Sequence, residues 1–171
     1  FIQTCGINTY HPLRKEIYYS RKELKGTINS KISLYRDYAK SWLGSFISVF
    51  DIAQKSYFSI DLVDLYNGHK FAIVGEEITG APALGALEAI ACGCVLFASP
   101  QYMVGLGLVE GRDYLPYDGT LVDLLKVKSN LDYKNLHKIS KSGNQIAQDE
   151  FSMVAVHAKW MQCFDSLETE L

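Results

Sequence analysis

One carboxylate stands inside a long run of small and apolar residues. Residues 85–99 read GALEAIACGCVLFAS, and Glu88 is the only charged residue among them. An acid in such a run either turns to water or is held by polar partners, because burying it unpaired costs more than the helix around it offsets. The residues one turn away on either side are Leu84, Gly85, Ala91 and Cys92. They offer no polar face, which favours a bound ligand as the partner of Glu88 over the alternative, a polar position on a surface helix.

The segment before Glu88 is typical of a phosphate-binding loop. Residues 75–82 read GEEITGAP and lead from an apolar strand into a helix of small residues. In an open α/β sheet, ligands bind beyond the carboxyl ends of the strands, and the N–H groups and dipole at a helix N-terminus favour an anion there. We expect the backbone N–H groups of Ala81, Ala83 and Leu84 to approach a phosphate. Glu88, about one turn further on, is then placed to accept hydrogen bonds from the paired hydroxyls of an attached ribose.

Alternating strand-like and helical runs position these residues. This alternation predicts parallel βαβ units, hence an α/β fold with a parallel sheet and helices on both of its faces. The predicted strands lie at about 1–5, 31–36, 69–75, 94–99 and 113–117. The last strand is expected at an edge, because Pro116 cannot donate a ladder hydrogen bond. Helices are predicted within 12–25, 37–66, 83–91, 120–128, 132–149 and 152–170. One stripe of the final helix holds Met153, Val156, Trp160, Phe164, Leu167 and Leu171.

Length, charge and cysteine usage narrow the class of protein. The chain has 171 residues, 48% of them hydrophobic, and a net charge of −2, which suits one folded domain and excludes general nucleic-acid binding. No apolar stretch reaches the roughly 20 residues that a membrane span needs. The chain opens directly on an apolar strand, so we expect it to be a piece of a longer protein. The cysteine spacing fits neither a disulfide framework nor a zinc site, which favours the reducing cytosol as the location of the protein. We expect the side chains of Cys92 and Cys94 to serve only in packing.

Two adjacent motifs carry a resemblance to a known family. GALEAIACGCVLFAS followed by VEGRDYLPYDGTLVDLL, residues 109–125, is similar to the C-terminal, nucleotide-sugar-binding half of group 1 glycosyltransferases with the GT-B fold. Both have an E-A-x-A-C-G helix, then a strand, then acidic and glycine residues before a further helix. The likeness is good over residues 71–128, whereas residues 1–67 match by order of elements and the helical tail in kind only. It implies that residues 1–171 form one Rossmann-like domain, half of a GT-B architecture, whose N-terminal acceptor-binding domain is absent from this chain.

The resemblance also implies a reaction and a donor site. The implied reaction is a retaining transfer of a hexosyl-type sugar from a nucleotide diphosphate donor to an unknown acceptor, which could be a saccharide, a lipid or a protein. Glu88 matches the second glutamate of the family's E-x7-E signature, which binds the donor ribose. Gly80 stands where the first glutamate is expected. Glu76 or Glu77 could take that catalytic role only if the loop folds back. The same loop would bring Thr79, Gly80, Ala81 and Leu84 to the donor.

A diphosphate donor also requires positive charge, because charge accumulates on the leaving group as the glycosidic bond breaks. The resemblance places it after the first strand, where Arg14 and Lys15 are the candidates and Asn8 could add a hydrogen bond, with Thr9 and His11. The alternative is that Arg14 and Lys15 belong to the solvated side of an amphipathic helix, together with Arg21, Lys22 and Lys25. The sequence leaves both interpretations open.

Other classes of function stay open or are disfavoured. The missing glutamate at Gly80 favours a second hypothesis, a non-catalytic nucleotide-binding or interaction domain derived from a transferase half. The spacing of the glycines in GLGLVEG, residues 105–111, does not fit a dinucleotide fingerprint, and we expect this loop to line the sugar end of the donor site.

No metal or other cofactor is predicted, since no D-x-D motif or His/carboxylate cluster is visible. The predicted partners are the nucleotide-sugar, the acceptor and the protein's own N-terminal domain, and a peripheral membrane location stays open.

Overall fold

A five-stranded parallel sheet forms the centre of the described structure, a computed structural model that covers residues 2–6, 12–33, 61–74 and 80–169. The strand order is β2-β1-β3-β4-β5, and each adjacent pair is parallel. The strands are β1 (Ile2–Gly6), β2 (Asn29–Ser33), β3 (Phe71–Ile73), β4 (Val95–Ala98) and β5 (Leu115–Pro116). The predicted α/β fold with a parallel sheet is confirmed, and β5 with Pro116 lies at the edge as expected.

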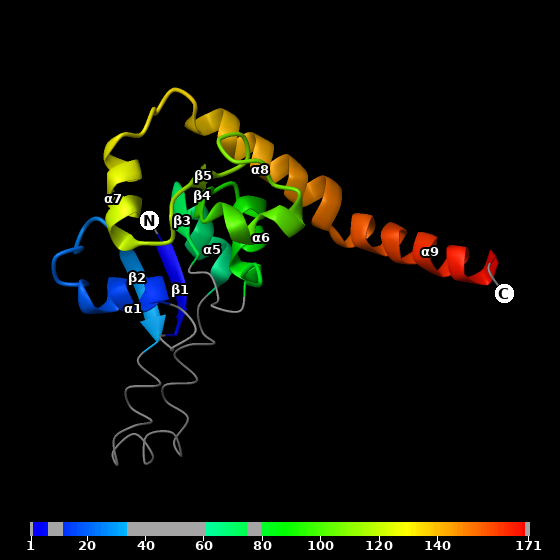
Figure 1. Ribbon diagram of the computed structural model, residues 1–171, viewed down its shortest axis with the longest axis horizontal. Helices are drawn as coiled ribbons and strands as arrows, with labels where there is room; N and C mark the ends of the chain where they lie inside the picture. The colour runs from blue at the N-terminus through cyan, green and yellow to red at the C-terminus, as the bar shows by residue number, and fades with distance from the viewer. Residues whose placement is uncertain (1, 7–11, 34–60, 75–79, 170–171) are drawn as a thin grey trace, which may run out of the picture.

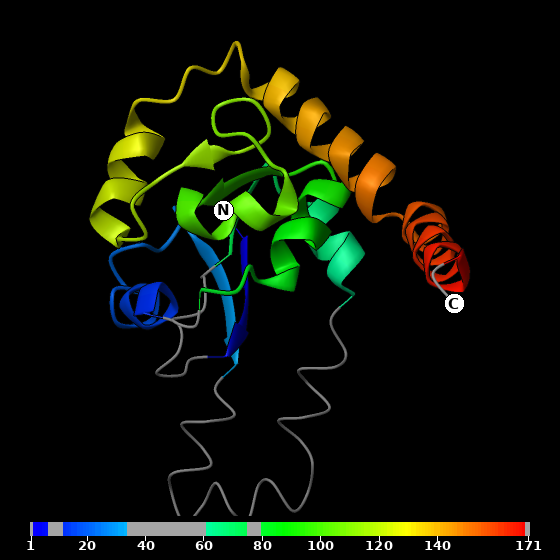
Figure 2. The same ribbon diagram turned by 45° about the vertical axis from the view of Figure 1, so that its right-hand side comes forward.

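Helices flank the sheet and then continue beyond it (Figures 1 and 2). The described helices are α1 (Pro12–Tyr19), α5 (Leu62–Asn67), α6 (Leu84–Ala91), α7 (Leu121–Ser129), α8 (Leu136–Phe151) and α9 (Met153–Thr169). Two short 3-10 turns, η1 (Pro100–Tyr102) and η2 (Val104–Leu106), follow β4. The first helix is shorter than predicted, since it ends at Tyr19 and the chain continues in successive turns to Gly26, where φ is +85°.

The sheet divides the described apolar residues into two cores, because successive strand residues face opposite sides. Ala72 in β3 and Val74 directly after the strand face one side of the sheet, whereas Ile73 between them faces the other. The first side packs against α5, α6 and α8, and the second against α1 and α7. The same alternation holds in β4, where Leu96 and Phe97 belong to different cores. Both faces are therefore covered, which explains the continuous apolar runs of β3 and β4.

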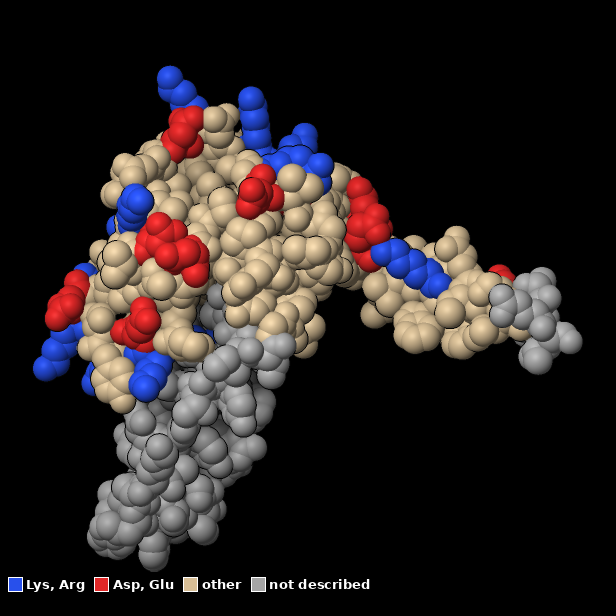
Figure 3. All heavy atoms as spheres, in the orientation of Figure 1, with Lys and Arg blue, Asp and Glu red and all other residues tan. Residues whose placement is uncertain are grey.

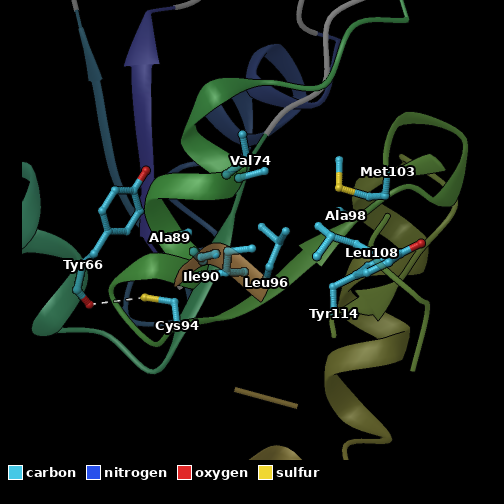
Figure 4. Packing of buried hydrophobic residues seen from close by; sticks show 13 residues of the cluster. Tyr66, Val74, Ala89, Ile90, Cys94, Leu96, Ala98, Met103, Leu108 and Tyr114 are labelled. Carbon is cyan, nitrogen blue, oxygen red and sulfur yellow. Dashed lines mark hydrogen bonds between the residues drawn. The ribbon is translucent and has the colours of Figure 1, made fainter. Parts of the chain in front are cut away.

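Helix α6 lies close against β3 because small residues line its inner face. Ala86, Ala89 and Ile90 are fully buried there. Figure 4 shows Ala89 and Ile90 in this core. A Cβ added at Gly85 would stand 3.3 Å from the Tyr66 hydroxyl oxygen and 3.5 Å from a Val74 methyl group. Gly85 thus allows the first turn of α6 to approach both α5 and the end of β3.

Helix α8 fastens this face of the domain through a buried carboxylate and a close backbone approach. Asp113 accepts hydrogen bonds from the Val109 N–H at 2.8 Å, from Arg112 at 2.8 and 2.9 Å, and from the Ser142 hydroxyl at 2.6 Å. One residue further along α8, a Cβ added at Gly143 would stand only 2.7 Å from the Asp113 carbonyl oxygen. The loop before β5 and helix α8 are thus held in contact.

Helix α9 follows a single extended residue and projects away from the sheet (Figures 1 and 2). Its first turns are tied back to α8, since the Lys159 ammonium donates at 2.6 Å to the Glu150 carboxylate. Residues 160–167 of the helix are exposed. No described helix combines the length and the apolar character that would be needed to cross a bilayer.

Candidate functional site

The strand order defines a topological switch point between β1 and β3. From β1 the chain passes outward to β2, and it later returns to the other side of β1 as β3. Ligands of such open sheets bind at this switch point, beyond the carboxyl ends of the two strands. The helices that start from this edge are α1, which follows β1, and α6, which follows β3. The topology therefore brings both predicted halves of the donor site, the basic pair and the Glu88 helix, to one edge of the sheet.

Part of the predicted site lies outside the described residues. This group consists of Asn8, Thr9, His11, Glu76, Glu77 and Thr79. The described members are Arg14, Lys15, Gly80, Ala81, Leu84 and Glu88. The predicted roles of these residues toward a donor stay predictions.

The N-terminus of α6 is open among the described residues. Its N-cap residue, Ala83, has extended backbone angles of φ −74° and ψ 134° and makes no side-chain cap hydrogen bond. No acidic residue stands in the first turn, and Ala81 and Leu84 are exposed, Leu84 to 79%. The first N–H groups of a helix have no partner within the helix and carry its positive dipole end. The start of α6 is consequently suited to an anion, in the place where the sequence predicts a phosphate.

The N-terminus of α7, which follows β5, shows the opposite arrangement. The Thr120 hydroxyl accepts from the Asp123 N–H at 3.2 Å, and the Glu16 carboxylate of α1 accepts from the Leu121 N–H at 3.1 Å. Asp118 accepts from both the N–H and the hydroxyl of Thr120, and these bonds lower the pKa of the Asp118 carboxyl. The chain therefore caps the helix at the sheet edge with its own side chains and leaves no place for an anion.

Glu88 is exposed on α6, and the expectation that this helix has no solvated face is wrong. Leu84 and Ala91, which share its side of the helix, are exposed as well. The exposed side is apolar except for Glu88, because the polar residues that usually cover such a face are missing from the sequence. Glu88 lies one turn beyond the open helix start on this accessible side, so a ligand bound at the start of α6 could reach it.

Arg14 and Lys15 differ sharply in burial. Arg14 is 6% exposed, although it lies in the first turn of α1 at the carboxyl edge of β1. Lys15, like the later basic residues of this segment, is exposed. A solvated helix face therefore describes Lys15 but not Arg14. Because helical side chains lean toward the helix N-terminus, the Arg14 guanidinium is expected on the side of α1 that faces the switch point.

Gly80 leads into α6 and stands close to an aromatic residue that the sequence did not single out. Its φ of +81° is a left-handed conformation that favours glycine, and a Cβ added there would be 3.9 Å from the Tyr102 ring. Tyr102 of η1 is half-buried, and Val104 of η2 is exposed. The chain after β4 thus borders the loop that enters α6. In the sequence, only position could have indicated Tyr102 and Val104, since both follow the end of a predicted central strand.

The loop of residues 105–111 borders a hollow of about 510 Å³, which is lined in part by Gly105, Leu106 and Gly107. Its other walls come from α8 and α9, including Phe151 and Lys159. The two cationic groups there already have partners, since Arg112 binds Asp113 and Lys159 binds Glu150. The prediction that this loop lines the sugar end of the donor site stays a prediction.

Neither Cys92 nor Cys94, which are both free thiols, is placed to be reactive. Cys94 is buried, and its thiol donates to the carbonyl oxygens of Tyr66 at 3.3 Å and His69 at 3.2 Å (Figure 4). Burial, followed by the nearby Cys92, raises the pKa of the Cys94 thiol to about 11. Burial and the charge of Glu88 raise the pKa of Cys92. Neither thiol is a ready nucleophile. Within the described residues, no group of three or more metal-ligating side chains comes together.

Comparison with known proteins agrees with this architecture. No protein-family model and no curated protein sequence matches the chain. Among solved structures, the chain is similar to a chain in the crystal structure of the GtfA/B complex, with a TM-score of 0.59 and 14% sequence identity. The similarity covers 96% of this chain and 35% of that chain, so the chain spans about a third of the length of this structural relative. The likeness is one of fold, and the predicted Rossmann-like half of a GT-B architecture is confirmed at that level.

Proposed function

We propose that this chain is the donor-binding half of a glycosyltransferase and binds a nucleotide diphosphate sugar at the edge of the sheet between β1 and β3. The observation that carries the proposal is the start of α6, which lies at the switch point without a side-chain cap and has an exposed carboxylate one turn further on. The structural likeness to a chain of the GtfA/B complex supports the same class of protein.

The proposed roles follow from the chemistry of a nucleotide diphosphate. The N–H groups at the start of α6 donate to the phosphates, and the positive end of the helix dipole stabilises their charge. Arg14, buried at the start of α1, adds fixed positive charge on the opposite side of the switch point. Glu88 accepts hydrogen bonds from the ribose hydroxyls. Stabilising the diphosphate as it leaves would be the contribution of this half to sugar transfer, whereas the acceptor would be held by a second domain.

A second candidate is a nucleotide-binding domain without transfer activity. Gly80 favours it, because the residue at the position of the family's first glutamate is a glycine in a left-handed conformation and supplies no carboxylate. Retention of the donor site together with loss of catalysis would be consistent with this substitution. The two candidates share the donor site and differ only in what happens to the bound sugar.

Calorimetric titration of the 171-residue chain with nucleoside diphosphates tests the shared claim. We expect binding by the wild-type chain, and a loss of roughly tenfold or more in Glu88→Ala, because hydrogen bonds to a charged group contribute about 1.5–3 kcal/mol. Asp149→Ala is the matched control, since Asp149 is an exposed acid on α8 and has no part in the proposed site. Equal affinity in wild type and Glu88→Ala would remove Glu88 from the site. Hydrolysis of a bound nucleotide-sugar by the full-length protein would favour the transferase, and binding without hydrolysis the second candidate.

A further inference from the structure

Tyr102 is anchored by the short η1 turn, which begins two residues after β4. Its N–H donates to the Ser99 carbonyl oxygen at 3.1 Å, and the Met103 N–H donates to the Pro100 carbonyl oxygen at 3.0 Å. Ser99 and Met103, which flank the turn, are both buried, and the Tyr102 side chain is partly buried against the core that includes the inner face of α6. The fold therefore fixes the Tyr102 ring from the β4 side.

The segment that leads into α6 has little support of its own. Residues 80–82 are all exposed. Among the described residues outside the adjoining chain, only Tyr102 has an atom within 4 Å of a Cβ built at Gly80, a ring carbon at 3.9 Å. Gly80 turns the chain with a φ of +81° and has no side chain that could hold this conformation. Within the described structure, the Tyr102 ring is thus the support of this turn.

The entry of the chain into α6 decides where the first N–H groups of the helix point. No charged residue stands between Gly80 and Leu87. Figure 3 shows the charged atoms of the visible face gathered mainly over α1, α7 and α8, with few where α6 lies. On this side, an anion is therefore attracted mainly by backbone N–H groups and the helix dipole. Such groups bind strongly only if they are held in place beforehand, because the cost of ordering them is subtracted from the affinity.

We propose that Tyr102 is a positioning residue of the donor site, whose ring holds the turn at Gly80 and thereby directs the N–H groups at the start of α6 toward the diphosphate. This inference rests on the proposed function, since it assigns a support to the same site. Tyr102 acts through Gly80 and need not touch the donor. Because the atom in contact is a ring carbon and not the hydroxyl oxygen, phenylalanine should replace Tyr102 and alanine should not.

Calorimetric titration of the 171-residue chain tests the effect on binding. The ligands are the diphosphates of adenosine, guanosine and uridine, each compared with its nucleoside. We expect Tyr102→Ala to weaken diphosphate binding roughly tenfold, the order that ordering one backbone residue costs, and to leave nucleoside binding unchanged. Tyr102→Phe should bind like wild type. Tyr133→Ala is the matched control, because Tyr133 is 69% exposed and lies between α7 and α8.

The outcomes separate this inference from the proposed function. Diphosphate binding by wild type that Tyr102→Ala leaves unchanged would overturn the inference alone. Equal weakening of diphosphate and nucleoside would overturn it too, since a general disturbance of the fold gives that result. If Tyr102→Phe binds as weakly as Tyr102→Ala, the ring contact is not what positions the turn. No binding of any diphosphate by wild type would overturn the proposed function and this inference with it.

Amide hydrogen exchange, followed by mass spectrometry without ligand, tests the support itself. The first turn of α6 is closed by the Ala86 N–H, which donates to the Ala83 carbonyl oxygen at 2.9 Å. Peptides covering residues 83–88 are expected to exchange faster in Tyr102→Ala than in wild type or Tyr102→Phe, and peptides from α7 to stay unchanged. Equal exchange in all three proteins, or faster exchange throughout Tyr102→Ala, would contradict a local support.

Discussion

The two ends of α6 are treated in opposite ways. At its C-terminus, the Asn144 amide donates to the carbonyl oxygens of Ile90 at 3.1 Å and Ala91 at 2.8 Å, and the Ser140 hydroxyl donates to the Gly93 carbonyl at 2.7 Å. At its N-terminus, Ala83 provides no side-chain cap. The same short helix is thus satisfied by the fold at one end and left open at the other.

This difference separates residues that hold the fold from residues available to a ligand. The polar groups of α8 and of the loop before β5 bind one another, so their removal should reduce stability. The start of α6 has no side-chain cap among the described residues, so changing it should alter binding with little loss of stability. Substitutions at the two ends can therefore break or sharpen the comparison.

The largest effect is expected at Asp113, which supports the closed side of the domain. Burial raises the pKa of its carboxyl, but hydrogen bonds from Arg112, Ser142 and Val109 outweigh this and lower the pKa below its ordinary value. We expect Asp113→Asn to lose about 3 kcal/mol of unfolding free energy at neutral pH, because it leaves Arg112 and the other donors without their charged acceptor. Urea denaturation measures this loss.

The pH dependence of the same variant gives the sign. A carboxyl whose pKa is lower in the folded state stabilises the fold above its unfolded pKa of about 3.9, and that contribution disappears as the pH falls through the folded pKa. The difference in stability between wild type and Asp113→Asn should therefore shrink below about pH 4. A difference that stays constant at acidic pH would show that the charge of Asp113 is not what stabilises the fold.

A smaller loss is expected from Gly143→Ala. Alanine is the better helix former by about 1 kcal/mol, but its Cβ would stand 2.7 Å from the Asp113 carbonyl oxygen, and overpacking of this kind costs about 1–3 kcal/mol. Because the atom in contact belongs to the backbone and cannot easily move away, we expect the upper end of this cost and a net loss of about 2 kcal/mol in denaturant unfolding. Gly105→Ala is the control, since a Cβ there meets nothing within 4 Å. An unchanged midpoint for Gly143→Ala would mean that α8 does not lie this close to the loop.

Ala83→Asp should close the open end of α6. Its extended backbone suits an N-cap, so the variant is expected to gain about 0.5–1 kcal/mol in unfolding free energy. Nucleoside diphosphate binding should weaken at least tenfold, because the new carboxylate competes with the phosphates for the N–H groups and repels them. Ala83→Asn supplies a neutral cap and should weaken binding less. Better stability combined with unchanged binding would place the anion elsewhere.

The smallest effect is expected from Asn144→Ala at the closed end. The variant loses two hydrogen bonds to carbonyl oxygens that can partly turn to water, so we expect a loss of about 1 kcal/mol and no change in nucleotide binding. Gln145→Ala serves as control, because its amide bonds only to Asp149 on the same exposed side of α8. A comparable loss in both variants would mean that the hydrogen bonds of Asn144 to the end of α6 make no specific contribution to stability.

The alternation of short apolar runs with amphipathic segments was sufficient to predict the α/β fold. Parallel strands buried on both faces have continuous apolar sequences, which made β3 and β4 recognisable. The helix predicted within 120–128 likewise corresponds to α7, Leu121–Ser129, with Thr120 as its N-cap. Local patterns of this kind do not depend on distant partners.

The sequence failed where distant segments decide. The sequence indicated no role for Asp113, because its partner Ser142 comes 29 residues later and no local pattern relates the two. The expectation about Glu88 assumed that an exposed helix face is polar, whereas α6 exposes Leu84 and Ala91. Arg14 shared the pattern of a solvated helix with Lys15, and only the packing of α1 separates them.

Discrimination between ribose and deoxyribose tests the role of Glu88 most directly. Calorimetry would compare a nucleoside diphosphate with its 2′-deoxy analogue, for the wild-type chain and for Glu88→Ala. If Glu88 accepts the ribose hydroxyls, the wild type should prefer the ribonucleotide by roughly tenfold, and Glu88→Ala should bind both equally weakly. A wild-type chain that binds both equally, or a variant that keeps the full preference, would contradict a ribose site at Glu88.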